Sequence, residues 1–140
     1  MGSTFSNLIY HLVFSTKYRA PIITENFASS LYQYIGGIIH SENGVLLQIG
    51  GMPDHIHILI RLKPTHTVAN ITKQIKGGSS LWLNQTHCIN EQFAWQEGYG
   101  AFSVSQSMTP TLRHYINNQA THHQKYTFDE EMNFLLEKNK

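Results

Sequence analysis

Apolar residues along the chain follow strand-like and helix-like spacings in turn. Three stretches are rich in β-branched, aromatic and other apolar residues, as strands are: residues 7–15, 45–50 and 55–62. Turn residues at 51–54 separate the last two stretches, so these are predicted to pair as antiparallel strands. Helical spacing of apolar residues begins after Thr24 and again after Thr67, and threonine is a suitable N-cap for each helix.

The second half of the sequence predicts one more strand region and two more helices. The strand region lies within residues 93–105. A Thr-Pro pair at 109–110 opens a third helix, because proline is favoured in the first turn, and this helix is predicted to run toward Tyr126. A short acidic helix over residues 129–138 follows it.

The order of these elements is β-α-β-β-α-β, followed by a C-terminal helix. This is the order of the split βαβ, ferredoxin-like fold. We therefore predict a single α+β domain over residues 1–140, built on an antiparallel sheet. In this fold the two main helices cover one face of the sheet, and the other face is expected to stay open for a ligand.

Composition narrows the class of protein and its cellular compartment. The 140 residues are 41% hydrophobic and 14% charged, which is typical of a folded globular chain. The net charge of +1 does not indicate a basic tail, so any nucleic-acid binding would rely on local groups of cationic side chains. The single cysteine, Cys88, excludes an internal disulfide framework and a multi-cysteine zinc site and fits a reducing cytoplasm. The apolar run at 8–14 is too short to span a bilayer, so we expect no signal peptide or membrane segment.

Two histidines interrupt the apolar pattern of residues 55–62, a strand that is central in the ferredoxin-like arrangement. Side chains alternate between the faces of a strand, so His55 and His57 share one face, while Ile56 and Ile58 point to the other. The isoleucine face suits a core beneath the helices. The two imidazoles form either part of a wet surface or half of a divalent-cation site, and a cation would need at least one more ligand.

Tyr115 and Gln119 offer complementary chemistry on the third predicted helix. They are four residues apart, so they lie one above the other on one helical face. A tyrosine oxygen can attack phosphorus when a metal draws charge off the phosphate, and the glutamine amide oxygen suits the same metal. The alternative is that Tyr115 only packs beside its apolar neighbours.

Basic residues gather in short groups after the first strand and on the second helix. A few well-placed charges suffice for phosphate contacts, although ordinary solvated charges would give the same pattern. The residues in question are Lys17, Arg19, Lys73 and Lys76.

The assembled sequence resembles the HUH single-tyrosine transposases of minimal insertion sequences, the TnpA type. The matching stretches follow the family's order and cover nearly the whole chain. They are YHLVFSTKYRAPI (10–22), GGMPDHIHILI (50–60), KQIKGGSS (73–80), FAWQEGYGAFSVS (93–105) and YINNQATHH (115–123).

This resemblance implies roles for the residues singled out above. The family's His-hydrophobic-His motif falls on His55 and His57 as metal ligands, and its tyrosine motif falls on Tyr115 as nucleophile with Gln119 as third ligand. The implied cofactor is Mg²⁺ or Mn²⁺. The implied reaction is metal-dependent cleavage and rejoining of single-stranded DNA at hairpin-marked element ends, through a 5′-phosphotyrosine.

The same resemblance implies a partner and a setting. It implies a two-fold homodimer with sites shared between subunits, in the cytoplasm of a prokaryotic cell and without a membrane partner. The helix that carries the tyrosine would cross from one subunit to the other. The expected DNA contacts are Lys17, Arg19, Lys73 and Lys76.

Three other functions are compatible with parts of the sequence. A domesticated relative would bind hairpin DNA without moving itself, but the residues at 55, 57, 115 and 119 are those that the chemistry requires. A ferredoxin-like RNA-binding module would show an aromatic-rich strand, which the GYGAFSVS stretch only faintly matches. A metal-dependent hydrolase that activates water would have no need of Tyr115.

Overall fold

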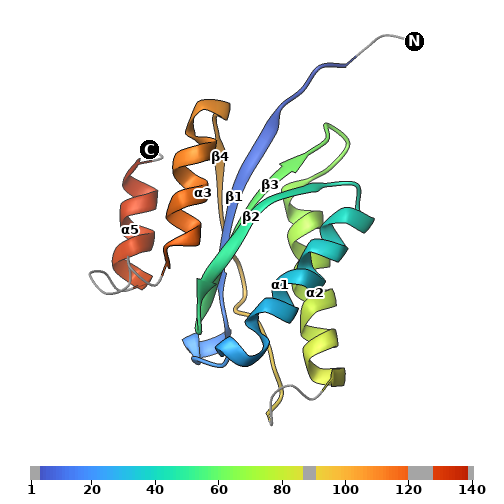
Figure 1. Cartoon of the computed structure of the whole chain (residues 1–140), viewed down its shortest axis with the longest axis vertical. Helices are drawn as coiled ribbons and strands as arrows, with labels where there is room; N and C mark the ends of the chain where they lie inside the picture. Colours follow the sequence, from blue (N-terminus) through green and yellow to red (C-terminus); the bar gives the residue numbers. More distant parts are fainter. Residues whose placement is uncertain (1–3, 87–90, 120–127, 139–140) are drawn as a thin grey trace.

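The computed structural model of the chain describes residues 4–86, 91–119 and 128–138. Its centre is a four-stranded antiparallel sheet with the strand order β2-β3-β1-β4 (Figure 1). The histidine motif therefore lies on β3, a central strand, as the sequence predicts. The strands are β1 (Leu8–Ser15), β2 (Val45–Met52), β3 (His55–Leu62) and β4 (Gly100–Val104).

Helices lie on both faces of this sheet. α1 and α2 pack on one face, whereas α3 and α5 lie on the other (Figure 1). The element order confirms the ferredoxin-like α+β fold, but the expectation of an open second face is wrong, because α3 and α5 cover it. The helices are α1 (Glu25–Ser41), α2 (Val68–Thr86), α3 (Thr109–Asn117) and α5 (Phe128–Lys138). Within the described residues, none of them is long and apolar enough to cross a membrane.

The face under α1 and α2 holds the main hydrophobic core. Ile56, Ile58 and Ile60 of β3 are fully buried there, as the alternation along the strand predicts. The helices add apolar residues at helical spacing: Phe27, Leu31, Ile35 and Ile39 from α1, and Ile71, Ile75 and Leu83 from α2. Because this core fixes the orientation of β3, the alternate residues of the strand must point to the opposite face.

A smaller apolar cluster lies under α3 on that opposite face. It consists of Ile9, Leu59 and Ile116. Gly50 of β2 lets α3 approach the sheet, since a Cβ atom at this position would lie 2.7 Å from the carbonyl oxygen of Ile116. The glycine therefore allows α3 to hold Tyr115, the residue before Ile116, close above the sheet.

Several element boundaries differ from the prediction. α3 ends at Asn117 rather than continuing toward Tyr126, which lies outside the described residues. Within the predicted strand region at 93–105, Trp95 makes an isolated β-bridge and β4 itself begins at Gly100.

Candidate active site and metal centre

The histidine pair lies at the centre of the site, on the β3 face covered by α3 and α5. Both His55 and His57 are 0% exposed, so they are core residues rather than part of a wet surface. The Nδ1 atom of His55 lies 2.7 Å from a carboxylate oxygen of Asp54, and Nδ1 of His57 lies 2.8 Å from Nε2 of the buried His11. These contacts orient both rings, as partners of metal-binding histidines do.

The Nε2 atoms of both histidines face side-chain oxygens. Oε1 of Glu131 lies 2.9 Å from Nε2 of His57 and 3.5 Å from Nε2 of His55. Oε1 of Gln119 lies 3.2 Å from the same His55 nitrogen. The ligand atoms of His55, His57 and Glu131 all lie within 4.8 Å of one another, so they can hold a metal ion.

The donor set fits a divalent cation. It offers two imidazole nitrogens together with carboxylate and amide oxygens, a mixture that suits Mn²⁺ and, through its oxygens, Mg²⁺. Gln119 is 2% exposed, and its Nε2 atom has no hydrogen-bond partner among the described residues. The oxygen of this buried amide lies among the other candidate ligand atoms beside His55, which fits a ligand role for that oxygen.

Tyr115 reaches this group from α3. Its ring makes an edge contact with the ring of His57, with 5.8 Å between centroids. Its hydroxyl donates a short hydrogen bond to Oε2 of Glu131, whose other oxygen accepts from His57. The candidate nucleophile and the candidate metal ligands therefore meet within one chain, so a site shared between subunits stays a prediction.

Burial and charge set the protonation states of the site. Burial lowers the pKa of His55, but its hydrogen bonds to Asp54 and Glu131 and their negative charges outweigh this and raise the pKa to about 9. Burial raises the pKa of Glu131, but hydrogen bonds from His55, His57 and Tyr115 hold it far below its usual range. Burial and the neighbouring Glu131 carboxylate raise the pKa of Tyr115 well above its ordinary value. Without a cation, the tyrosine thus keeps its proton, and a cation must displace the proton of His55.

Sequence reasoning missed Glu131. This residue is 4% exposed, whereas the preceding residues Asp129 and Glu130 are exposed. The available signal was its position in the acidic helix, where Glu131 shares a helical face with Leu135, four residues on. A carboxylate on the inward face of a helix needs a partner, and here the histidines and the tyrosine supply it.

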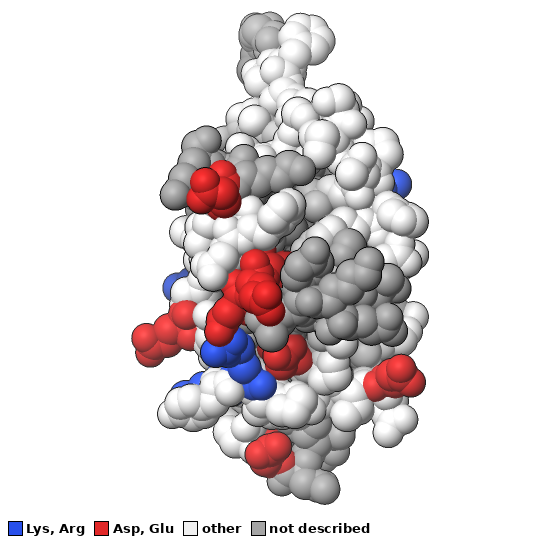
Figure 2. Space-filling view, turned by 90° about the vertical axis from the view of Figure 1, so that its left-hand side faces the viewer, with Lys and Arg blue, Asp and Glu red and all other residues white. Residues whose placement is uncertain are grey.

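The predicted DNA-contact residues are dispersed. Arg19 forms a 2.8 Å ion pair with Asp129 of α5, and Lys17 lies exposed nearby in the short helix η1 (Lys17–Arg19). Lys73 and Lys76 lie on α2, across the sheet from the histidines. The ammonium of Lys76 donates to two backbone carbonyls at 2.6 and 2.8 Å, which is a structural role. Acidic side chains gather on the α5 side of the molecule, next to a smaller basic group (Figure 2).

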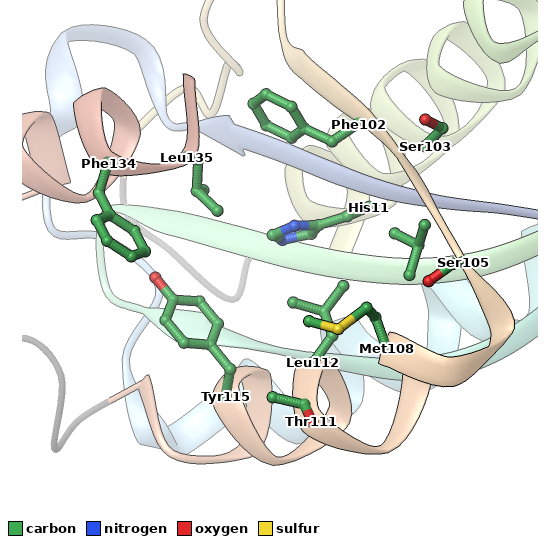
Figure 3. A pocket seen from close by; sticks show the side chains of 11 residues that line it. His11, Phe102, Ser103, Ser105, Met108, Thr111, Leu112, Tyr115, Phe134 and Leu135 are labelled. Carbon is green, nitrogen blue, oxygen red and sulfur yellow. The ribbon is translucent and has the colours of Figure 1, made fainter. Parts of the chain in front are cut away.

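A cavity of about 350 Å³ adjoins Tyr115 between the sheet, α3 and α5 (Figure 3). Phe102 of β4 and Phe134 of α5 contribute aromatic rings to its wall, and His11 contributes a polar group. The tyrosine is therefore accessible from this cavity although the histidines behind it are buried.

The chain is similar to known transposases along most of its length. It is 26% identical over 118 residues to the ISDra2 transposase TnpA of Deinococcus radiodurans, covering 80% of this chain and 84% of that protein. It is 29% identical over 129 residues to the transposase for insertion sequence element IS200 of Salmonella typhimurium, covering 85% and 81% of the two chains.

Two solved structures share the fold. A putative transposase from Deinococcus radiodurans superposes with a TM-score of 0.69 and 25% identity, covering 85% of this chain and 95% of the other. A REP-associated tyrosine transposase bound to a REP hairpin gives a TM-score of 0.65 at 12% identity, covering 88% and 74%.

The family model described as "Transposase IS200 like" matches residues 4–119. This span contains β1 to α3 and ends on Gln119, so it includes the histidine pair and the tyrosine that the fold brings together. The chain therefore belongs to the IS200-like transposase family.

Proposed function

We propose that this transposase cleaves and rejoins single-stranded DNA at hairpin-marked element ends, with Tyr115 as the nucleophile. The observation that carries this proposal is the contact of the Tyr115 hydroxyl with a buried group that also contains His55 and His57. The REP hairpin in the structurally similar tyrosine transposase supports hairpin DNA as the substrate class.

His55, His57 and Gln119 would hold the divalent cation, Mg²⁺ or Mn²⁺, through the nitrogens and the oxygen that already face one another. When bound, the cation would polarise the scissile phosphate and stabilise the charge that develops in the in-line transition state. Asp54 and His11 position the two imidazoles from behind, which keeps their Nε2 atoms directed into the site.

The reaction exchanges one phosphodiester bond for another. The Tyr115 oxygen forms a bond to phosphorus and releases its proton to solvent in the adjoining cavity, since the low pKa of Glu131 makes the carboxylate that it contacts too weak a base to keep that proton. The bond between phosphorus and the 3′ oxygen breaks, and that oxygen takes up a proton to leave a free 3′-hydroxyl. The 5′-phosphotyrosine keeps the bond energy, so the 3′-hydroxyl of another strand can reverse the step without ATP.

The cavity beside Tyr115 supplies room for the substrate (Figure 3). Single-stranded nucleic acids are bound by stacking of unpaired bases on aromatic side chains. Phe102 and Phe134 line this cavity, so it suits a base next to the scissile phosphate. A double-stranded substrate would keep its bases stacked and could not fill it.

Incubation with labelled hairpin-containing single strands and Mn²⁺ tests the proposal. We expect a covalent protein–DNA adduct that survives denaturing electrophoresis and disappears when the cation is chelated. The fully paired duplex of the same sequence is the control and is expected to remain uncut. Cation-dependent cleavage without any adduct would instead favour a hydrolase that activates water.

Excision of an element requires two cleavages, whereas one tyrosine forms one covalent link at a time. We therefore propose that the active form is a two-fold dimer whose sites combine His55 and His57 of one subunit with Tyr115 and Gln119 of the other. The connection from β4 to α3 contains a single short helix, η2 (Gln106–Met108). A change of the backbone conformation in this connection would carry α3 to a partner's sheet. This exchange would replace the contact seen within the single chain.

Mixing two inactive variants tests the shared site. A His57→Gln subunit and a Tyr115→Phe subunit are combined, and heterodimers are verified by differential tags. With shared sites, one site carries both defects and the other is intact, so cleavage should return to about a quarter of the wild-type rate in a random mixture. If each site is built within one subunit, every site keeps one defect, and a mixture that stays inactive rejects the shared-site proposal.

A further inference from the structure

α5 makes a polar contact at the centre of the site that it covers. Glu131 and Leu135 face the sheet and are buried, whereas Phe134 and Leu136 are 60% and 52% exposed. The carboxylate of Glu131 lies at the centre of what this helix covers. At the outer surface, the ion pair between Asp129 and Arg19 is largely exposed and contributes little.

We propose that Glu131 is a further ligand of the divalent cation, and that cation binding fastens α5 against the sheet. This inference rests on the proposed function, because it needs the cation that the histidine pair would hold. It adds a carboxylate ligand from a segment that follows residues 4–119, the part of the chain that matches the family model.

The distances between donor atoms favour a ligand over a chance contact. Ligands at right angles around an ion, with bonds of about 2.0–2.1 Å, lie about 3 Å apart. Oε1 of Glu131 lies 2.9 Å from Nε2 of His57 and 3.5 Å from Nε2 of His55, and Gln119 Oε1 lies 3.2 Å from that second nitrogen. An ion placed among these atoms would require only small shifts of side chains.

The negative charge of Glu131 also favours a ligand role. His55, His57 and Gln119 alone would provide a neutral ligand set once the imidazoles lose their extra protons, and hard cations bind more tightly when a carboxylate is added. Glu131 is the carboxylate that contacts both imidazoles, whereas the carboxylate of Asp54 contacts His55 through the Nδ1 atom, on the far side of the ring. With Oε1 on the ion, Oε2 would still face the Tyr115 hydroxyl.

Calorimetric titration of the cation-free full chain with MnCl₂ tests the ligand assignment without measuring activity. Glu131→Gln keeps the size of the side chain and an oxygen acceptor, so the fold should persist, which circular dichroism checks. We expect it to weaken Mn²⁺ binding at least about tenfold, on the scale of losing a conserved partner in a metal site. The matched control is Glu130→Gln, which removes the same charge from the exposed neighbouring position and should change affinity less than about twofold.

Hydrogen exchange tests the coupling to α5. Mn²⁺ should slow exchange of the backbone amides of Phe128–Lys138 in the wild type and in Glu130→Gln, but not in Glu131→Gln. Unchanged Mn²⁺ affinity in Glu131→Gln would overturn the ligand assignment. Tighter Mn²⁺ binding in this variant would overturn it as well, because Glu131 would then occupy the position of the ion and compete with it.

A third variant separates failure of this inference from failure of the proposed function. If His57→Gln loses Mn²⁺ binding while Glu131→Gln keeps it, the histidine site stands and the Glu131 inference is wrong. If the wild-type chain itself binds no Mn²⁺, both proposals fail together.

Discussion

Replacement of Tyr115 by phenylalanine is expected to abolish the covalent protein–DNA adduct completely while leaving hairpin binding within about twofold of wild type. The change removes the nucleophilic oxygen and leaves the ring, whose edge contact with His57 needs no hydroxyl. The lost hydrogen bond to Glu131 should cost about 1–3 kcal/mol of folding free energy, because a buried acceptor loses one donor. Denaturing electrophoresis with labelled DNA measures the adduct, and a gel-shift assay measures binding.

Tyr99→Phe is the matched control for this prediction. Tyr99 is 40% exposed and precedes β4, so its replacement should leave adduct formation unchanged. An adduct that persists in Tyr115→Phe would show that another tyrosine attacks the phosphate, with Tyr99 and Tyr126 as the next candidates. Loss of hairpin binding along with the adduct would instead mean that the Tyr115 hydroxyl holds DNA.

Local sequence patterns were sufficient to predict the sheet and the helices on one of its faces. Ile56, Ile58 and Ile60 alternate with the histidines, and alternation is a local property of a strand that tertiary structure rarely overrides. The cap at Thr67 is local in the same way, since its hydroxyl accepts a hydrogen bond from the backbone N–H of Asn70. The order of these elements then restricted the topology to very few alternatives.

The packing of α5 on the second face of the sheet could not be predicted from such patterns. α5 combines three acidic residues in its first turn with five apolar residues among its eleven, and its sequence does not indicate which surface the apolar residues contact. The inward position of Glu131 is explained by its partners, which are the imidazoles of His55 and His57 and the phenol of Tyr115. These residues lie 16 to 76 positions earlier in the sequence. The resemblance to transposases did not supply this residue either.

Lys76 illustrates a related limit of prediction from sequence. Lys76, an expected DNA contact, binds the backbone carbonyls of Gln96 and Gly98 and lies 5.4 Å from the ring centroid of Phe14, and its role in DNA binding stays a prediction. A count of charges along the sequence cannot separate a cation that binds phosphate from one that holds a loop. Its partners are about twenty residues away, so only the folded chain reveals them.

Replacement of His57 by alanine is expected to abolish cleavage and to destabilise the protein at the same time. An open sheet face would have tolerated this change without loss of stability, but His57 is fully buried among His11, Tyr115 and Glu131. The alanine removes a metal ligand, so cleavage should fall by about 10²–10³-fold or more, the scale of losing a group that stabilises transition-state charge. It also leaves a cavity and a less well-paired carboxylate, at a cost of about 2–5 kcal/mol.

Two further variants separate the lost ligand from the lost stability. His57→Gln fills most of the space and can still donate to Glu131, so it should recover most of the unfolding free energy in urea titration while cleavage and Mn²⁺ binding remain impaired. His40→Ala, on the exposed side of α1, should change neither quantity. Near wild-type cleavage by His57→Gln, with unaltered dependence on the cation, would show that the chemistry does not need an imidazole at this position. Impaired cleavage in a stable, correctly folded His57→Gln chain, by contrast, would have no explanation in packing and would leave the ligand role of His57 as its cause.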